Sequence, residues 1–195
     1  MDNNFYQSLR EAIVEYAMDT EDPFKNYVLA ILYESIGQTA SAVTFFLRAS
    51  ERTENDNLAY ECLLRMSFCF DAQGNRNNTV RSVLRSAITL LPKRPEAYYL
   101  LAKAYEKTGS FVDCYLFSKL ALDFCDFNQP NLNTYVKYPG KYGLIYQKAL
   151  GAWWWGKSQE SRDLFVLLKK EYIDQLDEAH RLGLEENIRK LNCSV

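Results

Sequence analysis

Residues Tyr98 to Gly109 read YYLLAKAYEKTG, and this stretch decides the fold. Its apolar and small residues recur at i, i+3, i+4 and i+7, a spacing that places them on one stripe of an α-helix. The glycine at its end suits the left-handed position at which many helices stop. Residues 110–124, SFVDCYLFSKLALDF, then show helical spacing again. The stretch therefore predicts two helices joined by a short turn.

The same pattern occurs twice upstream. The turn glycines Gly37, Gly74 and Gly109 lie 37 and 35 residues apart, which is the period of helical-hairpin repeats. A fourth pair follows after a loop rich in Asn and Pro at 125–140, and its first helix ends near Gly156. A single hairpin leaves one apolar face uncovered, so neighbouring hairpins must stack.

These pairs resemble the tetratricopeptide repeat (TPR). The residues that carry the resemblance are Leu29, Ala30, Tyr33, Ala42 and Phe46 in the first pair, and Tyr98, Leu101, Ala102 and Tyr105 in the third. We expect an all-α protein, an α-solenoid of about four TPR-like helical hairpins with terminal capping helices. The expected single domain, 1–195, comprises an N-terminal helix at 1–22, hairpins at 24–53, 57–91, 95–124 and 140–171, and a C-terminal capping helix at 173–192.

Residues 91–168 resemble, in addition, the helical repeat module that accompanies family 2 type glycosyltransferases. The resemblance rests on Leu91-Pro92-Lys93-Arg94-Pro95-Glu96, on Tyr142-Gly143 and on Trp155-Gly156. The sequence has no parallel-sheet pattern and no Asp-x-Asp at a strand end. The resemblance therefore implies an accessory module that holds a protein or glycan acceptor, not the catalytic domain.

Composition agrees with an ordinary globular chain. The protein has 195 residues, 48% of them hydrophobic, with only 8 Gly and 5 Pro, which excludes a disordered or collagen-like chain. No window approaches eighteen uncharged apolar residues, and residues 1–10 lack the basic and apolar run of a signal peptide. We therefore expect a cytoplasmic, intracellular protein that does not contact a membrane. The five cysteines form no C-x-x-C pair, so neither a disulfide framework nor a metal site is expected.

Charge is distributed unevenly along the chain. Residues 1–61 hold 11 acidic and 4 basic residues, residues 62–157 hold 6 and 13, and residues 158–195 hold 8 and 6, which gives −7, +7 and −2. The bases are scattered as on solvated helix faces, so no nucleic acid partner is expected. The opposite signs leave self-association possible.

Two short motifs suggest nucleotide chemistry. Residues 151–158, GAWWWGKS, satisfy the phosphate-loop expression G-x-x-x-x-G-K-S, and residues 177–180 read DEAH. A phosphate loop follows a buried strand, whereas the residues before Gly156 have helical spacing. His180 is the only histidine, and we expect it on an exposed helix face. No catalytic residue and no cofactor are predicted, and the protein is expected not to be an enzyme.

Binding is the better prediction. In stacked hairpins the first helix of each pair lines the concave face, and Tyr and Trp concentrate binding energy when they are desolvated. The expected groove residues are Tyr27, Glu34, Arg65, Phe68, Asp71, Tyr99, Lys103, Glu106, Tyr146, Gln147 and Trp153. Each tyrosine could instead fill a gap between repeats. The run 153–155, WWW, spans about 200° of a helix, so at least one Trp should reach the surface.

The sequence thus predicts a non-enzymatic interaction or scaffolding module that binds a protein or peptide segment in its concave groove. Two alternatives stay open. One is the accessory module of a glycosyltransferase. The other is a structural subunit of a larger assembly, in which an acidic front meets the basic middle of a neighbour.

Overall fold

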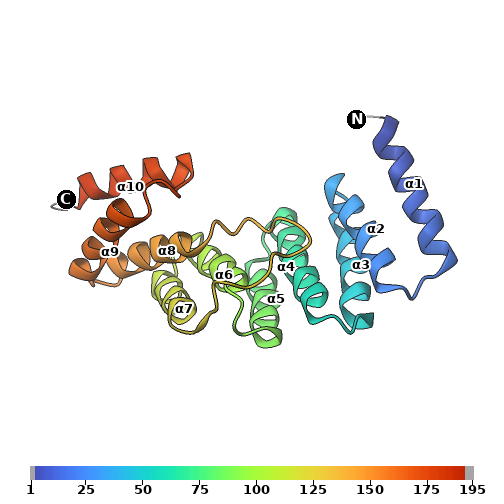
Figure 1. Ribbon diagram of the computed structural model, residues 1–195, viewed down its shortest axis with the longest axis horizontal. Coiled ribbons are helices and arrows are strands. Elements are labelled where there is room, and N and C mark those ends of the chain that lie inside the picture. The colour runs from blue at the N-terminus through green and yellow to red at the C-terminus, as the bar shows by residue number, and fades with distance from the viewer. Residues whose placement is uncertain (1–2, 192–195) are drawn as a thin grey trace. The chain divides into compact units, whose positions relative to one another are not determined.

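A computed structural model describes residues 3–191, with side chains from residue 7 onward, and these residues form ten α-helices. The helices are α1 (Asn3–Met18), α2 (Pro23–Ser35), α3 (Thr39–Arg52), α4 (Asp56–Gln73), α5 (Asn77–Leu90), α6 (Glu96–Glu106), α7 (Phe111–Phe124), α8 (Lys141–Trp154), α9 (Ser158–Glu171) and α10 (Glu178–Lys190). Successive helices pack against each other in two runs, from α1 to α5 and from α6 to α10 (Figure 1). The all-α, TPR-like solenoid fold is confirmed.

The chain divides into two compact units. Unit 1 contains residues 1–91 and 130–136, and unit 2 contains residues 92–129 and 137–195. Residues 1–2 and 192, at the ends of the helices expected from the sequence, lie outside the described residues.

Unit 1 is built on α1 to α5, each packed against the next. Two of these helices begin at strong caps, because Asp22 accepts hydrogen bonds from the amides of residues 24 and 25, and Asn55 from those of residues 57 and 58. Ala42 and Ala49 are fully buried on either side of Phe46, so their small side chains let α3 approach its neighbours closely.

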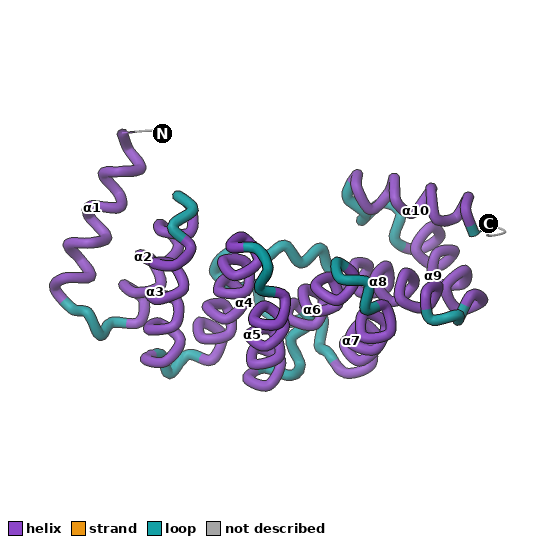
Figure 2. The backbone as a smooth tube through the Cα atoms, turned by 180° about the vertical axis from the view of Figure 1, so that it is seen from behind, coloured by secondary structure: helices purple, strands orange, loops and turns teal. Residues whose placement is uncertain are grey.

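The expected turn glycines end their helices. Gly37 and Gly156 have φ values of 74° and 79°, a region that favours glycine. The amide of Gln38 donates to the carbonyl of Tyr33, and the amide of Lys157 donates to the carbonyl of Ala152. This six-to-one bond is the Schellman closure of a helix end. Short loops join most successive helices, as the teal segments in Figure 2 show.

Unit 2 is built on α6 to α10. Its buried core joins α8, α9 and α10 through Ile145, Phe165, Leu168 and Leu184. At the entry to α6, Arg94 is 3% exposed and donates two hydrogen bonds to the carboxylate of Glu96, at 2.6 and 3.2 Å. Such a bidentate pair fixes the direction in which the chain enters the helix.

The C-terminal helix is shorter than the sequence suggests. We expected it from residue 173, but α10 begins at Glu178, because the side chain of Asp177 accepts a hydrogen bond from the amide of His180. His180 itself is less exposed than expected, since its side chain is 14% exposed and its ring meets those of Tyr142 and Tyr146 edge to face. Its ring nitrogen lies 2.8 Å from Asp177, so it serves the helix cap.

The phosphate-loop expression has a structural explanation. Gly151 lies inside α8, where an added Cβ would come within 2.8 Å of the backbone of Phe111 and Tyr115 on α7. Gly156 supplies the turn between α8 and α9. A helix therefore precedes Lys157 where a phosphate loop needs a strand, and within residues 3–191 the structure contains none.

Four of the five cysteines lie within the described residues. Cys62, Cys69 and Cys114 are buried free thiols and Cys125 is a partly buried free thiol, while Cys193 lies outside the described residues.

Across residues 3–191, no helix combines the length and the apolar character needed to cross a bilayer.

Candidate protein-interaction site

The loop between α7 and α8 supplies part of unit 1. This connection runs from residue 125 to residue 140, and its middle portion, 130–136, belongs to unit 1. Exposure alternates along that portion. The buried or half-buried side chains are Leu132, Thr134 and Val136. The exposed side chains are Asn131, Asn133 and Tyr135. We call residues 130–136 the loop segment; it lies along the helices of unit 1 without helical structure of its own.

A buried carboxylate on α4 holds this segment. The side chain of Glu61 is fully buried. One of its oxygens, Oε2, accepts a hydrogen bond from the backbone amide of Asn133 at 2.8 Å. The other, Oε1, accepts from the backbone amide of Thr134 at 2.9 Å and from the Thr134 hydroxyl. Two consecutive backbone N–H groups therefore meet one carboxylate, which a bend at residues 133–134 allows.

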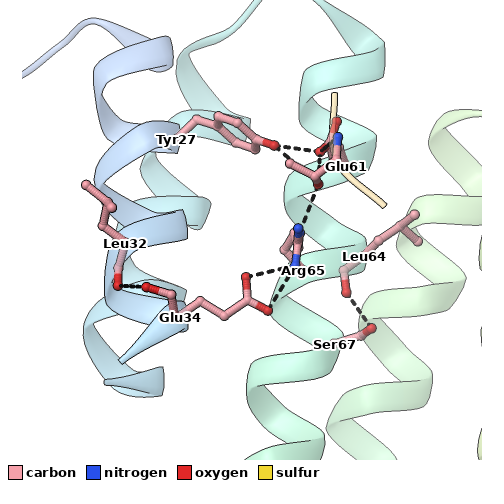
Figure 3. Close-up of polar contacts among 9 residues, drawn as sticks. Tyr27, Leu32, Glu34, Glu61, Leu64, Arg65 and Ser67 are labelled. Atoms are coloured by element: carbon pink, nitrogen blue, oxygen red, sulfur yellow. Dashed lines mark hydrogen bonds and ion pairs between the residues drawn. The ribbon is translucent and has the colours of Figure 1, made fainter. Parts of the chain in front are cut away.

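Tyr27, Arg65 and Glu34 complete the arrangement. The Tyr27 hydroxyl, from α2, donates to Glu61 at 2.5 Å. Arg65 on α4 donates from Nε to the Thr134 hydroxyl at 3.1 Å and from Nη1 to Glu34 of α2 at 3.2 Å. Figure 3 shows Tyr27 and Glu61 pointing toward each other, with Arg65 reaching across to Glu34. We call Tyr27, Glu34, Glu61 and Arg65 the α2/α4 site.

The electrostatics of the α2/α4 site favour donors over further anions. It holds two carboxylates and one guanidinium, so its formal charge is negative. Burial, followed by the hydrogen bond to the Glu61 carboxylate, raises the pKa of the Tyr27 hydroxyl. Tyr27 therefore stays protonated and continues to donate to Glu61. Burial and the neighbouring Glu61 also raise the pKa of the Cys62 thiol to about 12, which keeps this sulfur unreactive.

The two expected groove residues on α4 beyond Arg65, Phe68 and Asp71, differ in their exposure to solvent. Phe68 is partly buried, and Asp71 is exposed near the end of the helix. Of the expected residues in unit 1, the structure thus brings Tyr27, Glu34 and Arg65 into one hydrogen-bonded site.

The expected groove residues of unit 2 are mostly covered. Tyr99 is 3% exposed and meets Tyr138 edge to face, and Gln147 is 1% exposed next to the thiol of Cys114. The hydroxyl of Tyr146 accepts a hydrogen bond from the Asn187 amide on α10. Lys103 is exposed and Glu106 is partly buried. For Tyr99, Tyr146 and Gln147 the structure shows packing contacts within unit 2.

The tryptophan run reaches the surface, as its angular spread requires. Trp153 is partly buried in the core of α8, α9 and α10, and Trp154 is 64% exposed and stacks on Phe111. Trp155 is 40% exposed and meets Tyr115 edge to face. Trp153 and Trp154 border a cleft of about 330 Å³ whose other lining residues include Leu150, Phe165 and Asn187.

Sequence reasoning missed Glu61 and the loop segment. Glu61 lies one helical turn before Arg65, and it interrupts an otherwise apolar run at 58–64, LAYECLL. A charged residue in such a run, on the same face as Arg65, is a signal that could have identified it. The partner residues 133 and 134 lie 72 and 73 positions further along the chain, and no local pattern indicates that pairing.

Fold comparison places the chain in a known structural class. No protein-family model matches it, and no curated protein matches its sequence. Solved structures do match: a crystal structure of MamA has a TM-score of 0.64 at 16% identity, covering 97% of this chain and 98% of that one. A thermophilic TPR protein of Thermus thermophilus, TTC0263, has a TM-score of 0.56 at 16% identity, covering 96% and 90%. The chain is a TPR-like helical protein.

At 16% identity, the similarity to these structures is a similarity of fold. Among residues 3–191, no group of three or more His, Cys, Asp or Glu side chains is arranged to hold a metal ion. The resemblance of residues 91–168 to a glycosyltransferase-associated module stays a prediction, since the matching structures concern the fold alone.

Proposed function

We propose that this protein is a non-enzymatic interaction module that holds a segment of a partner protein on the α2/α4 site. One observation carries the proposal: the buried Glu61 carboxylate already binds two consecutive backbone amides of a non-helical segment, 133–134. This is how a protein recognises a peptide chain through its backbone. The loop segment shows by example what this surface accommodates.

The geometry favours binding over chemistry. Tyr27 donates to Glu61, Arg65 donates to the Thr134 hydroxyl and to Glu34, and Glu61 accepts several hydrogen bonds. Backbone amides give affinity that depends little on sequence, while the Thr134 hydroxyl between Glu61 and Arg65 adds selectivity. Phe68 and Asp71 extend the proposed surface along α4, beyond Arg65. In unit 2, Lys103 and Glu106 of α6 remain proposed contacts for a partner.

A displayed library of random twelve-residue segments tests this function. We would select it against the wild-type protein and, in parallel, against Thr134→Val, in which the loop segment has lost one side-chain anchor. Segments that bind should lose at least about tenfold in affinity on Glu61→Gln, because a hydrogen bond to a charged acceptor contributes about 1.5–3 kcal/mol. Glu51→Gln, an exposed change on α3, is the matched control.

Two results would contradict the proposal. One is a selection that yields no binding segment with either protein. The other is a set of segments whose affinity is the same for the wild type and for Glu61→Gln.

A further inference from the structure

The connection between α7 and α8, which contains the loop segment, is longer than those between the neighbouring helices. Helices α7 and α8 pack against each other, as do α6 with α7 and α8 with α9. Those other pairs are joined by residues 107–110 and 155–157, whereas α7 and α8 are joined by residues 125–140. The middle of this connection belongs to unit 1, and its two ends belong to unit 2. Long loops in compact domains are usually either functional or disordered, and here hydrogen bonds fix residues 133–134 of the loop on Glu61.

The hold on the loop segment is local. Only Val136 in the segment is buried, and Tyr135 is 73% exposed. The segment has no helix and no strand pairing, and the hydrogen bonds that hold residues 133 and 134 are made with Glu61, Tyr27 and Arg65. Regions with few buried apolar contacts open at a small fraction of the free energy of global unfolding. The segment can therefore leave while helices α2 and α4 stay folded.

The Glu61 carboxylate needs other hydrogen-bond donors when the segment leaves. Three of its four donors come from Asn133 and Thr134, and only the Tyr27 hydroxyl comes from the helices. A buried carboxylate that loses its donors is strongly destabilised, so an empty site is disfavoured. An incoming segment that offers the same donors remakes the lost bonds.

We infer, resting on the proposed function, that the loop segment is an internal ligand of the α2/α4 site and that a partner binds by displacing it. The partner's segment carries the same pattern, apolar-x-Ser/Thr-x-apolar, which in this chain is Leu132, Thr134 and Val136. A proline cannot stand at the hydroxyl position or just before it, because both residues must donate a backbone N–H.

The hydroxyl is the specific element of this pattern. In the chain it donates to Glu61 and accepts from Nε of Arg65, so both of its hydrogen-bonding roles are used. Serine can fill both roles. Valine has nearly the shape of threonine, but it removes one hydrogen bond from the Glu61 carboxylate and one from the Arg65 guanidinium. A site built to hydrogen-bond a hydroxyl discriminates strongly against an analogue that lacks it.

The tethered loop segment sets the affinity that a partner needs in order to displace it. A tethered segment competes at an effective concentration on the order of millimolar, because both its ends are fixed to the protein. The apparent affinity of a free peptide with the same contacts is therefore its intrinsic affinity multiplied by the fraction of sites that the loop segment leaves free. A natural partner overcomes this by contacting more of the surface than residues 130–136 do.

A titration with a labelled peptide tests the inference. The probe is a fluorescein-labelled peptide with the sequence of residues 129–137, QPNLNTYVK, and binding is measured by fluorescence anisotropy. It is offered to the wild-type protein and to a variant whose residues 131–136 are replaced by a Gly-Ser repeat of equal length. We expect the loop-replaced protein to bind the probe at least about tenfold more tightly than the wild type.

Matched probes and variants identify the contacts. In the probe, Thr134→Ser should keep the affinity within about threefold, whereas Thr134→Val should lower it at least about tenfold. Adding Glu61→Gln to the loop-replaced protein should abolish the gain in affinity, and Glu51→Gln should not. If the loop-replaced protein loses its helical circular dichroism, the full-length Thr134→Val protein takes its place, and it should bind the unmodified probe more tightly than the wild type does.

The outcomes separate this inference from the proposed function. Equal binding of the probe to the wild-type and loop-replaced proteins overturns the displacement, although the site would still bind peptides. A probe that binds neither protein, when library segments bind in a Glu61-dependent way, overturns the ligand pattern alone. A probe and a library that both fail overturn the inference and the function together.

Discussion

At the scale of the residue, the molecule depends on how Glu61 is satisfied. A fully buried carboxylate is tolerated only when donors surround it, and here four donor groups from α2 and the loop segment do so. The sequence predicted Tyr27, Glu34 and Arg65 as neighbours on the inner helices, because helical spacing alone fixes which residues share a face. It could not predict which backbone amides donate to Glu61, since every residue except proline carries a backbone N–H.

The first prediction concerns the charge of Glu61. Glu61→Gln puts an amide NH₂ where an oxygen accepts a hydrogen bond, so at least one buried donor of residues 133–134 loses its partner. We expect the free energy of unfolding of the protein to fall by about 2 kcal/mol in urea titrations followed by circular dichroism. Glu51→Gln, a change of an exposed side chain on α3, should change it little. A stability equal to wild type would show that the carboxylate does not hold the segment.

The second prediction concerns pH. The raised pKa of Tyr27 means that the unfolded chain, with a tyrosine pKa of about 10, loses this proton first as the pH rises. The stabilisation from Tyr27 is therefore complete below about pH 10 and is lost above it. Tyr27→Phe removes a hydrogen bond to the Glu61 carboxylate, so it should lower the unfolding free energy by about 1.5–3 kcal/mol at neutral pH, and stability should then decline less steeply above about pH 10. Parallel declines for the two proteins would contradict the role of this hydroxyl.

At the scale of the element, the hairpin is the unit that sequence predicts well. Periodic apolar residues and turn glycines mark where each helix runs and stops, and the Schellman closures at Gly37 and Gly156 confirm the turns. Capping chemistry moved the start of α10 to Glu178. The sequence could not predict the path of residues 125–140, because loop composition indicates irregular structure but does not indicate which helices the loop contacts.

The third prediction tests the close approach of α7 and α8. An alanine in a helix interior is ordinarily about 1 kcal/mol more favourable than glycine. At Gly151 the added Cβ would lie 2.7 Å from the Tyr115 amide nitrogen and 2.8 Å from the Phe111 carbonyl oxygen, both backbone atoms that cannot swing aside. Gly151→Ala should therefore destabilise the protein by about 1–3 kcal/mol in thermal or urea unfolding. A stabilised variant would mean that the two helices pack less tightly than the structure shows.

At the scale of the whole molecule, the chain is a TPR-like series of helical hairpins. The TPR-like fold was predictable because repetition multiplies a weak local signal. The choice among adaptor, glycosyltransferase accessory and assembly subunit was not, because that choice depends on surfaces and partners that a repeat pattern does not encode. The expectation that bases in the middle of the chain permit self-association also stays a prediction.

The fourth prediction concerns nucleotides. The Lys157 amine lies 4.3 Å from the centre of the Tyr115 ring and 4.2 Å from that of Trp155, and a helix precedes it. This amine is engaged by aromatic faces in a turn between helices, not by a loop that follows a strand. Wild type and Lys157→Ala should therefore both release no phosphate from ATP above the buffer control. Turnover that Lys157→Ala abolishes would contradict the account of residues 151–158.

Amide hydrogen exchange at residues 133 and 134 is the most direct measurement. By nuclear magnetic resonance, the exchange rates of these two backbone amides report whether Glu61 holds them. The account predicts that both exchange at least about tenfold more slowly than the exposed amides of an unstructured chain, and that Glu61→Gln removes this protection while Glu51→Gln preserves it. Exchange at the unprotected rate in the wild-type protein would contradict the claim that the α2/α4 site binds a peptide backbone.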